Sequence, residues 1–155
     1  MEEAMAKIPS WHEYFFTIME AASLRSKDPE TRVGAVIVDS NNRQIAMGYN
    51  GFPPGIREED GRWDRPTKYD FVVHAEMNAI FNSHQSVKGC SVYLPFWPCK
   101  DCAKNLAAAG ISTINILSDY YKSDIAELIF KESGINVVKH LTSDWTKPIN
   151  HKQTT

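Results

Sequence analysis

The sequence predicts an α/β fold, a three-layer α/β/α sandwich around a five-stranded mixed sheet. Short apolar runs bounded by turn residues alternate with amphipathic segments of helical period along most of the chain. After one hairpin near the start, helices and strands alternate, which implies parallel pairing through right-handed crossovers. The length of 155 residues suits one domain, which we expect over residues 1–141, followed by a polar tail at 142–155.

The first part of the chain predicts one helix and a hairpin. A Ser-x-x-Glu capping box begins an apolar helical pattern over residues 11–26, and Pro29 prevents its continuation. The run 33–39 is short, β-branched and nearly all apolar, which is typical of a strand buried on both faces. The turn pair Asn41-Asn42 then returns the chain as a second strand over 44–49.

Residues 51–71 form a long loop rich in glycine, proline and charge, with four basic and five acidic side chains. Loops of this length inside a compact domain usually bind something or are disordered. The aromatic residues of this loop argue against simple disorder.

The second part of the chain alternates between the two kinds of element. Gly110 and Gly134 are positioned to end two of the helices. We expect helices at 74–84, 99–109 and 123–133. We expect strands at 90–94, 111–117 and 135–138.

Two of these helices begin with residues that can hold a metal. Cys99 and Cys102 stand one helical turn apart after Pro98, so one ion can bind both thiolates. His74 offers a third ligand, which leaves a tetrahedral zinc one open position, as in a catalytic site. Glu76 is placed to carry protons beside the metal, because side chains at i and i+2 do not share a helix face. Together these motifs match the pattern of zinc nucleobase deaminases.

Other interpretations of the cysteines remain open. Cys99 and Cys102 could form a thioredoxin-like redox pair, although this leaves His74 and Glu76 unexplained. A structural zinc with Cys90 as fourth ligand is the second alternative, and a buried position for Cys90 is the simpler interpretation.

Composition narrows the class of partner. The net charge of −2 argues against a strong electrostatic grip on nucleic acid. An odd number of cysteines, three in all, argues against a disulfide framework. There is no long apolar run and no signal peptide, so we expect no membrane partner and a cytoplasmic location.

At this point the sequence strongly resembles the deoxycytidylate (dCMP) deaminases of the cytidine deaminase-like superfamily. The resemblance extends from about residue 25 to 141 and rests on these motifs: Arg25-Ser-Lys-Asp-Pro29, Val33-Gly-Ala35, Gly48-Tyr-Asn-Gly51, His74-Ala-Glu-Met-Asn-Ala-Ile80, Pro98-Cys-Lys-Asp-Cys102 and Ser118-Asp-Tyr-Tyr121.

The resemblance implies hydrolytic conversion of dCMP to dUMP, which feeds thymidylate synthesis. The long loop contains no spare cysteine cluster for a second metal, so we expect one zinc per subunit. The resemblance also implies that Asn50 contacts the sugar hydroxyl and that Arg25, Tyr121 and Lys122 hold the 5′-phosphate. The full set of substrate contacts that it implies is Arg25, Asn50, Ala75, Pro98, Tyr121 and Lys122.

Many members of this family are homohexamers that dCTP with Mg²⁺ activates and dTTP inhibits, so the resemblance implies an oligomer and an effector site. The effector site corresponds to Asn50, Gly51, Phe52, Arg57, Glu58, Trp63, Lys68 and Tyr69.

Four rival functions remain. A tRNA adenosine deaminase would need a basic face that the mixed-sign charges do not supply. Deamination of free cytidine would need no phosphate contact. A non-catalytic nucleotide sensor would not need the intact Glu76. A zinc-stabilised interaction module would hold a zinc without an exchangeable water.

Overall fold

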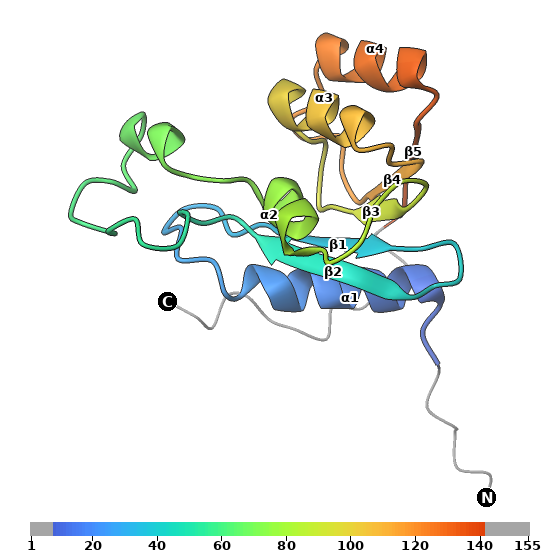
Figure 1. Ribbon diagram of the computed structural model, residues 1–155, viewed down its shortest axis with the longest axis horizontal. Helices are drawn as coiled ribbons and strands as arrows, with labels where there is room; N and C mark the ends of the chain where they lie inside the picture. The colour runs from blue at the N-terminus through green and yellow to red at the C-terminus, as the bar shows by residue number, and fades with distance from the viewer. Residues whose placement is uncertain (1–7, 142–155) are drawn as a thin grey trace, which may run out of the picture.

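The computed structural model describes residues 8–141 and has three layers (Figure 1). Helix α1 (Trp11–Ser23) covers one face of the sheet, and α2 (Ala75–Asn82), α3 (Lys100–Ala108) and α4 (Asp124–Ser133) lie on the other side. The sheet has five strands in the order β2-β1-β3-β4-β5. Its strands are β1 (Gly34–Val38), β2 (Gln44–Tyr49), β3 (Ser91–Tyr93), β4 (Thr113–Ile116) and β5 (Asn136–Lys139). The expected α/β/α sandwich is therefore confirmed.

Strand directions explain why the sheet is mixed. Strand β1 pairs antiparallel with β2 and with β3, whereas β3–β4 and β4–β5 are parallel. The connection β2-α2-β3 is a crossover that passes over β1, so β3 runs parallel to β2 and antiparallel to the strand between them. The next two crossovers, through α3 and α4, add neighbouring parallel strands.

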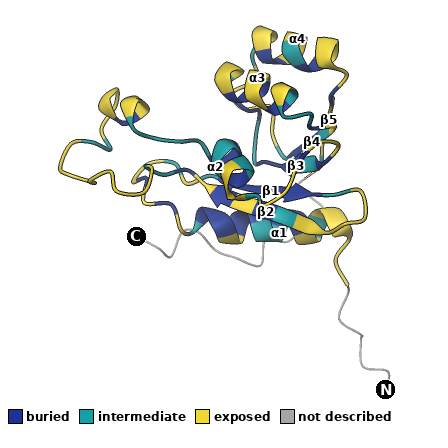
Figure 2. Cartoon of the chain, viewed as in Figure 1, coloured by how far each residue is buried: buried dark blue, intermediate teal, exposed yellow. Residues whose placement is uncertain are grey.

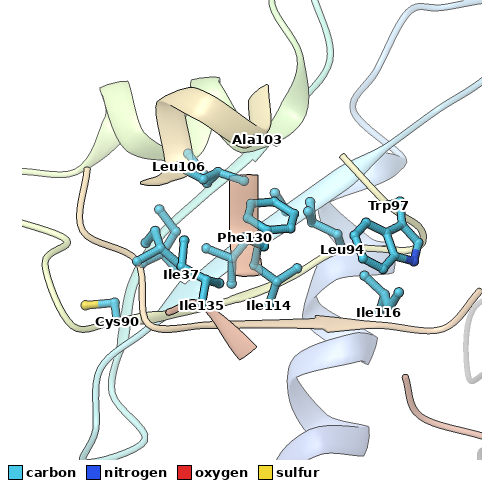
Figure 3. Packing of buried hydrophobic residues seen from close by; sticks show 14 of the residues in the cluster. Ile37, Cys90, Leu94, Trp97, Ala103, Leu106, Ile114, Ile116, Phe130 and Ile135 are labelled. Atoms are coloured by element: carbon cyan, nitrogen blue, oxygen red, sulfur yellow. The ribbon is translucent and has the colours of Figure 1, made fainter. Parts of the chain in front are cut away.

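The core lies on both faces of β1, all five residues of which are buried. Val36 and Val38 pack against Phe15 and Phe16 of α1. Ala35 and Ile37 belong to the larger cluster under the other three helices, which Figure 3 shows around Ile37, Leu106 and Phe130. Burial on both faces is why this strand is a continuous apolar run instead of an alternating one.

Two glycines let helices approach the hairpin closely. A Cβ on Gly34 would lie 1.9 Å from the carbonyl oxygen of Met19 in α1. A Cβ on Gly48 would lie 2.4 Å from the Ala79 nitrogen and 2.6 Å from the Ala75 oxygen in α2. Each glycine therefore brings a helix backbone against a strand, and Gly48 brings the beginning of α2 close to the end of β2.

Helix α1 ends at Ser23, three residues earlier than the predicted end at residue 26. The reason is a set of polar contacts made by the segment that follows. The Ser26 hydroxyl donates to the Asn50 carbonyl at 2.8 Å, and both Ser26 and Asp28 are buried. Most other boundaries differ from the predicted ones by one or two residues, as is usual at fraying ends.

The long loop projects from the body of the molecule (Figure 1), and Figure 2 shows that most of it is exposed. Its ends are joined where Gly51 and Val73 exchange backbone hydrogen bonds of 3.1 and 2.8 Å. Inside it, Phe52 stacks on Trp63 at 4.2 Å, and a short 3-10 helix spans Thr67–Asp70. The loop is thus an organised segment with a fixed base.

None of the helices within residues 8–141 combines the length and the apolar character that crossing a bilayer requires.

Candidate metal centre

The candidate metal ligands lie at the beginnings of α2 and α3. His74 and Cys99 are the N-cap residues of these helices, and both have extended backbone angles. Cys102 lies in the first turn of α3, and its backbone N–H donates to the Cys99 sulfur at 3.4 Å. The sequence predicted Cys99 inside the first turn of this helix. In the structure Cys99 lies one residue before the helix begins. Its sulfur takes the capping role that a serine or aspartate oxygen usually fills.

The three side chains converge on one point. The Nδ1 atom of His74 lies 3.3 Å from the Cys102 sulfur and 3.5 Å from the Cys99 sulfur. All three ligand atoms lie within 4.8 Å of one another. Nitrogen and sulfur ligands of a tetrahedral zinc lie about 3.6 Å apart, given the usual bond lengths. The donor set and its spacing therefore fit zinc, with Nδ1 as the ligating atom of His74.

Glu76 lies beside this cluster and is almost fully buried. Its Oε1 atom accepts from the Cys102 thiol at 3.1 Å and lies 3.8 Å from His74 Nδ1. Burial raises the pKa of this carboxyl above its usual value. The carboxyl group therefore borders both the cluster and the space in front of it.

Hydrogen bonds within the cluster shift the pKa values of its three residues in different directions. The hydrogen bond from Cys102 and the one from His74 lower the pKa of the Cys99 thiol to about 4. The bond to Cys99 and then burial raise the pKa of Cys102. The pKa of His74 is raised, first by its hydrogen bond to Cys99. Negative charge therefore concentrates on Cys99, at the side where a cation would bind.

A cavity of about 250 Å³ opens in front of the cluster. One end of it is formed by the beginnings of α2 and α3, and the long loop supplies a wall. The residues that line it are Asp28, Thr31, Val33, Asn50, Arg65, Lys68, Tyr69, Val72, His74, Ala75, Glu76, Phe96, Trp97, Pro98, Cys99 and Tyr121.

A buried polar network of Asp28, Asn50 and Lys68 forms a second wall of the cavity. Lys68 pairs with Asp28 at 3.0 Å, and the two side chains are only 6% and 2% exposed. Asn50 accepts from the Val33 N–H at 2.8 Å and donates to the Thr31 carbonyl at 2.9 Å. Its amide nitrogen also lies 3.4 Å from the Asp28 carboxylate, so three separate partners hold the Asn50 side chain in place.

Asn78 of α2 links two segments of the site. Its side-chain amide donates to the Tyr49 carbonyl at 2.8 Å and to the Val73 carbonyl at 3.2 Å. Tyr49 precedes Asn50 and Val73 precedes His74. One amide therefore ties together the segments that carry Asn50 and His74, both of which line the cavity.

The structure brings together only part of the substrate set that the resemblance implied. Asn50, Ala75, Pro98 and Tyr121 line the cavity. Arg25 is exposed and is not a lining residue. Lys122 is also outside the lining, where it pairs with Glu127 at 3.5 Å and lies over the Trp97 ring.

The residues of the expected effector site fall into two groups. Asn50, Lys68 and Tyr69 line the cavity itself. The others belong to the body of the long loop, where Phe52 stacks on Trp63, Arg57 pairs with Glu59, Glu58 pairs with Lys27, and Gly51 forms the bridge at the loop base.

Sequence reasoning missed several cavity residues. Asp28 belongs to the motif Arg25-Ser-Lys-Asp-Pro29, and its position before Pro29 is the local signal for it in the sequence. Trp97, which donates to Asp119 at 3.2 Å, directly precedes Pro98 in the sequence, and no motif distinguishes it there. Arg65 gave no local signal, because it is one of several charges in the loop.

Comparison with known proteins agrees with this geometry. Residues 9–118 match the family model described as the cytidine and deoxycytidylate deaminase zinc-binding region. The deoxycytidylate deaminase of Homo sapiens is 42% identical over 142 residues, which cover 84% of this chain and 80% of that protein.

Two solved structures are also similar. The dCMP deaminase of cyanophage S-TIM5, in complex with dCMP and dUMP, has a TM-score of 0.72 and 29% identity, and the match covers 87% of this chain and 100% of that chain. A tRNA:A34 deaminase with a TM-score of 0.58 and 18% identity, covering 84% of this chain and 100% of that chain, shares the fold. The resemblance seen in the sequence is confirmed, and the chain belongs to the cytidine and deoxycytidylate deaminase zinc-binding family.

Proposed function

We propose that this protein catalyses the hydrolytic deamination of dCMP to dUMP and so supplies thymidylate synthesis. The observation that carries the proposal is the convergence of His74, Cys99 and Cys102 with the buried Glu76 at the end of one cavity. The human and phage relatives named above as deaminases of this nucleotide support the choice of substrate.

In the proposed reaction, water adds to C4 of cytosine, the C4–N4 bond breaks, and ammonia leaves as the carbonyl forms. His74, Cys99 and Cys102 would hold the zinc ion, which would supply Lewis-acid activation of the water. Glu76 takes one proton from the water and delivers it to the ring nitrogen N3, and it then carries the remaining hydroxyl proton of the C4 adduct to the departing amine. Its carboxyl group lies beside the cluster, with Oε1 at 3.8 Å from His74 Nδ1.

The cavity walls orient the nucleotide. Ala75, Phe96 and Trp97 give the metal end an apolar lining that suits the cytosine ring and excludes other water. Asn50 faces the same cavity from the polar wall, where its fixed amide is suited to the sugar hydroxyl. Tyr121 lines the cavity from the segment after β4, where it is suited to the phosphate.

The proposal is tested by ammonia release from dCMP. We expect the zinc-loaded protein to release ammonia, and Glu76→Gln to keep its zinc and lose about 10²–10⁴-fold in turnover, because only the proton carrier is removed. Glu132→Gln, on the exposed side of α4, is the matched control and should keep full activity. Retained turnover in Glu76→Gln, or no ammonia from the wild type, would contradict the proposal.

The proposal includes regulation by dCTP with Mg²⁺ as activator and dTTP as inhibitor. The support is that the long loop supplies Lys68 and Tyr69 to the cavity wall, so a nucleotide bound by the loop could alter that wall. Titration of dCTP, with and without Mg²⁺, and of dTTP into the ammonia assay tests this regulation. Turnover that responds to neither nucleotide would contradict it.

The proposal also includes assembly into a homo-oligomer, a hexamer by resemblance. Sedimentation equilibrium tests this assembly.

A further inference from the structure

We propose that Asp119 is a positioning residue for the cavity, and that it acts by holding the indole of Trp97 in place. The proposed function gives Asp119 no role. The inference rests on that function, because the cavity that Trp97 lines is taken there as the substrate site. Asp119 is not itself one of the lining residues.

The indole of Trp97 is almost fully buried, and its segment leads to the metal centre. Trp97 is 6% exposed, lines the cavity and stands two positions before Cys99. In Figure 3 its ring lies at one end of the buried cluster, with the nitrogen directed away from Phe130. A buried indole N–H needs an acceptor, because an unpaired one costs free energy. The placement of the ring therefore depends on the group that accepts from it.

Asp119 supplies that acceptor. The Trp97 Nε1 atom donates to one oxygen of the Asp119 carboxylate at 3.2 Å. The other oxygen accepts from the Lys139 ammonium of β5 at 2.6 Å. These hydrogen bonds, the one from Lys139 first, lower the pKa of Asp119, so the acceptor is ionised at neutral pH. A hydrogen bond to an ionised group is stronger than one between neutral groups.

The other contacts of the ring come from the same part of the chain. The Lys122 ammonium lies 5.4 Å from the ring centroid, where a cation is attracted to the aromatic face. Phe130 of α4 packs against the ring at 5.9 Å between centroids. The backbone N–H of Trp97 donates to the Tyr120 carbonyl at 3.1 Å. The segment after β4, together with α4, therefore holds this side chain.

The contact joins two segments that line the cavity. Residues 96–99 line it from the segment before α3, and Tyr121 lines it from the segment after β4. The Leu117 N–H donates to the Pro95 carbonyl at 3.2 Å, so the backbones of the two segments are also joined. Since the first segment ends at a candidate metal ligand, a shift of the indole would move the cavity wall that adjoins this ligand in the chain.

A surface ion pair is the simpler role for Asp119. The side chains of Asp119 and Lys139 are 53% and 49% exposed, and a pair of this kind contributes little net free energy. If the ion pair were the whole role of Asp119, its loss would leave the cavity unchanged. The hydrogen bond to the buried Trp97 distinguishes the two roles, and the variants below separate them.

The indole resonance of Trp97 reports this hydrogen bond directly. In a proton–nitrogen correlation spectrum of the zinc-loaded protein, the indole resonance that is missing from Trp97→Phe belongs to Trp97. We expect Asp119→Ala to shift this proton upfield and to speed its exchange with water, because the acceptor is lost. Asp119→Asn keeps an oxygen acceptor and should restore most of the shift. An identical resonance in the wild type and in Asp119→Ala would overturn the proposal.

The ammonia assay measures what the hydrogen bond contributes to the reaction. We expect Asp119→Ala to keep its zinc and to lower kcat/KM for dCMP by about 10-fold, as expected for the loss of one hydrogen bond to a charged group. Asp119→Asn should recover most of this loss. Glu132→Ala removes an exposed carboxylate of α4 and is the control that should change neither the resonance nor kcat/KM.

A double variant tests whether Asp119 acts through Trp97. In Trp97→Phe the donor is already absent, so adding Asp119→Ala should cause little further loss of kcat/KM. A further loss as large as that of Asp119→Ala alone would show that Asp119 acts on another group, and it would overturn the proposal. An unchanged kcat/KM in Asp119→Ala would also overturn it.

Binding of dUMP separates this inference from the proposed function. Calorimetry gives the Kd of dUMP for the wild type and for Asp119→Ala. If the wild type releases no ammonia but Asp119→Ala binds dUMP more weakly than the wild type, the positioning role stands and the deaminase function fails. If the wild type deaminates dCMP and Asp119→Ala equals it in kcat/KM and in Kd, the function stands and the positioning role fails.

Discussion

Among single residues, Asp28 and Lys68 have the largest consequences outside the metal cluster. Burial alone would raise the pKa of Asp28, but hydrogen bonds from the Glu30 N–H and the Lys68 ammonium, among others, outweigh it and hold the pKa below 3.8. The carboxylate thus remains charged, and it holds Lys68 of the long loop and Asn50 of the cavity wall in place. The pair anchors one wall of the active site.

Loss of one member of this pair should be costly. In Lys68→Met the Asp28 carboxylate stays buried without its cation, so we expect the free energy of unfolding to fall by about 3 kcal/mol. Denaturant titration measures the change. The double variant Asp28→Asn/Lys68→Met should recover part of the loss, and Lys27→Met, whose exposed pair with Glu58 contributes less than about 1 kcal/mol, is the control. Equal stability of Lys68→Met and Lys27→Met would contradict this account.

The same pair predicts an acid dependence of stability. The pKa of Asp28 in the folded protein lies below the ordinary value of 3.8, so its contribution is complete above about pH 4. That contribution disappears as the pH falls through the folded-state pKa, because the carboxylate must be protonated. Urea titrations between about pH 5 and 2 should show a shallower loss of stability in Asp28→Asn than in the wild type. Parallel curves for the two proteins would show that Asp28 is not responsible.

At the scale of elements, the site depends on how closely β2 approaches α2. Gly48 allows the backbones to touch, and Asn78 then reaches the carbonyls of Tyr49 and Val73. Asn82 of the same helix donates to the Met47 carbonyl at 3.0 Å, so α2 also satisfies the outer edge of β2. His74 begins α2, and its position follows from this contact.

We therefore expect Gly48→Ala to damage both stability and the metal site. The added methyl would lie 2.4 Å from the Ala79 nitrogen, and overpacking of this kind costs about 1–3 kcal/mol or more. Zinc affinity should fall with it, because α2, which begins at His74, is displaced from its position on β2. Gly51→Ala is the matched control, since its nearest neighbour is a Tyr49 ring atom at 3.9 Å. Thermal unfolding measures the loss of stability, and zinc titration measures the loss of zinc affinity. If Gly48→Ala bound zinc as tightly as the wild type, the contact between β2 and α2 would not be what positions the metal site.

At the scale of the whole molecule, the metal cluster joins two helices that are distant in sequence. His74 begins α2, while Cys99 and Cys102 belong to α3, and the two helices otherwise share few contacts. A bound metal therefore links α2, which packs on the β1–β2 hairpin, to α3, which connects the parallel strands β3 and β4. This makes metal binding part of the stability of the molecule as well as of its chemistry.

Removal of zinc should lower the melting temperature. A ligand at about 1,000 times its Kd stabilises the native state by about 4 kcal/mol, which corresponds to a shift on the order of 10 °C for a domain of this size. Calorimetry before and after treatment with a chelator measures the shift. Cys102→Ser should melt at a lower temperature and should not respond to added zinc. A chelator-resistant melting temperature in the wild type would show that the cluster holds no structural metal.

The sequence by itself determined the order and type of the elements and the three residues of the candidate metal cluster. Both depend on local information. Apolar periodicity separates helix from strand over a few residues, and Cys99 and Cys102 are one turn apart in any helix that begins there. Even His74, though distant, was predictable, because ligands that begin helices gather at the same edge of an α/β sheet.

Only the tertiary structure decided which polar residues surround the cavity. Lys68 meets Asp28 across 40 positions of the chain, and Arg65 reaches the cavity because the long loop is closed at Gly51 and Val73. Arg25 is exposed in the segment after α1, where the neighbouring Ser26 is held by the Asn50 carbonyl. These placements arise from contacts between distant segments. Neither the secondary-structure propensity of a residue nor the spacing of motifs along the sequence indicates which distant segments come into contact.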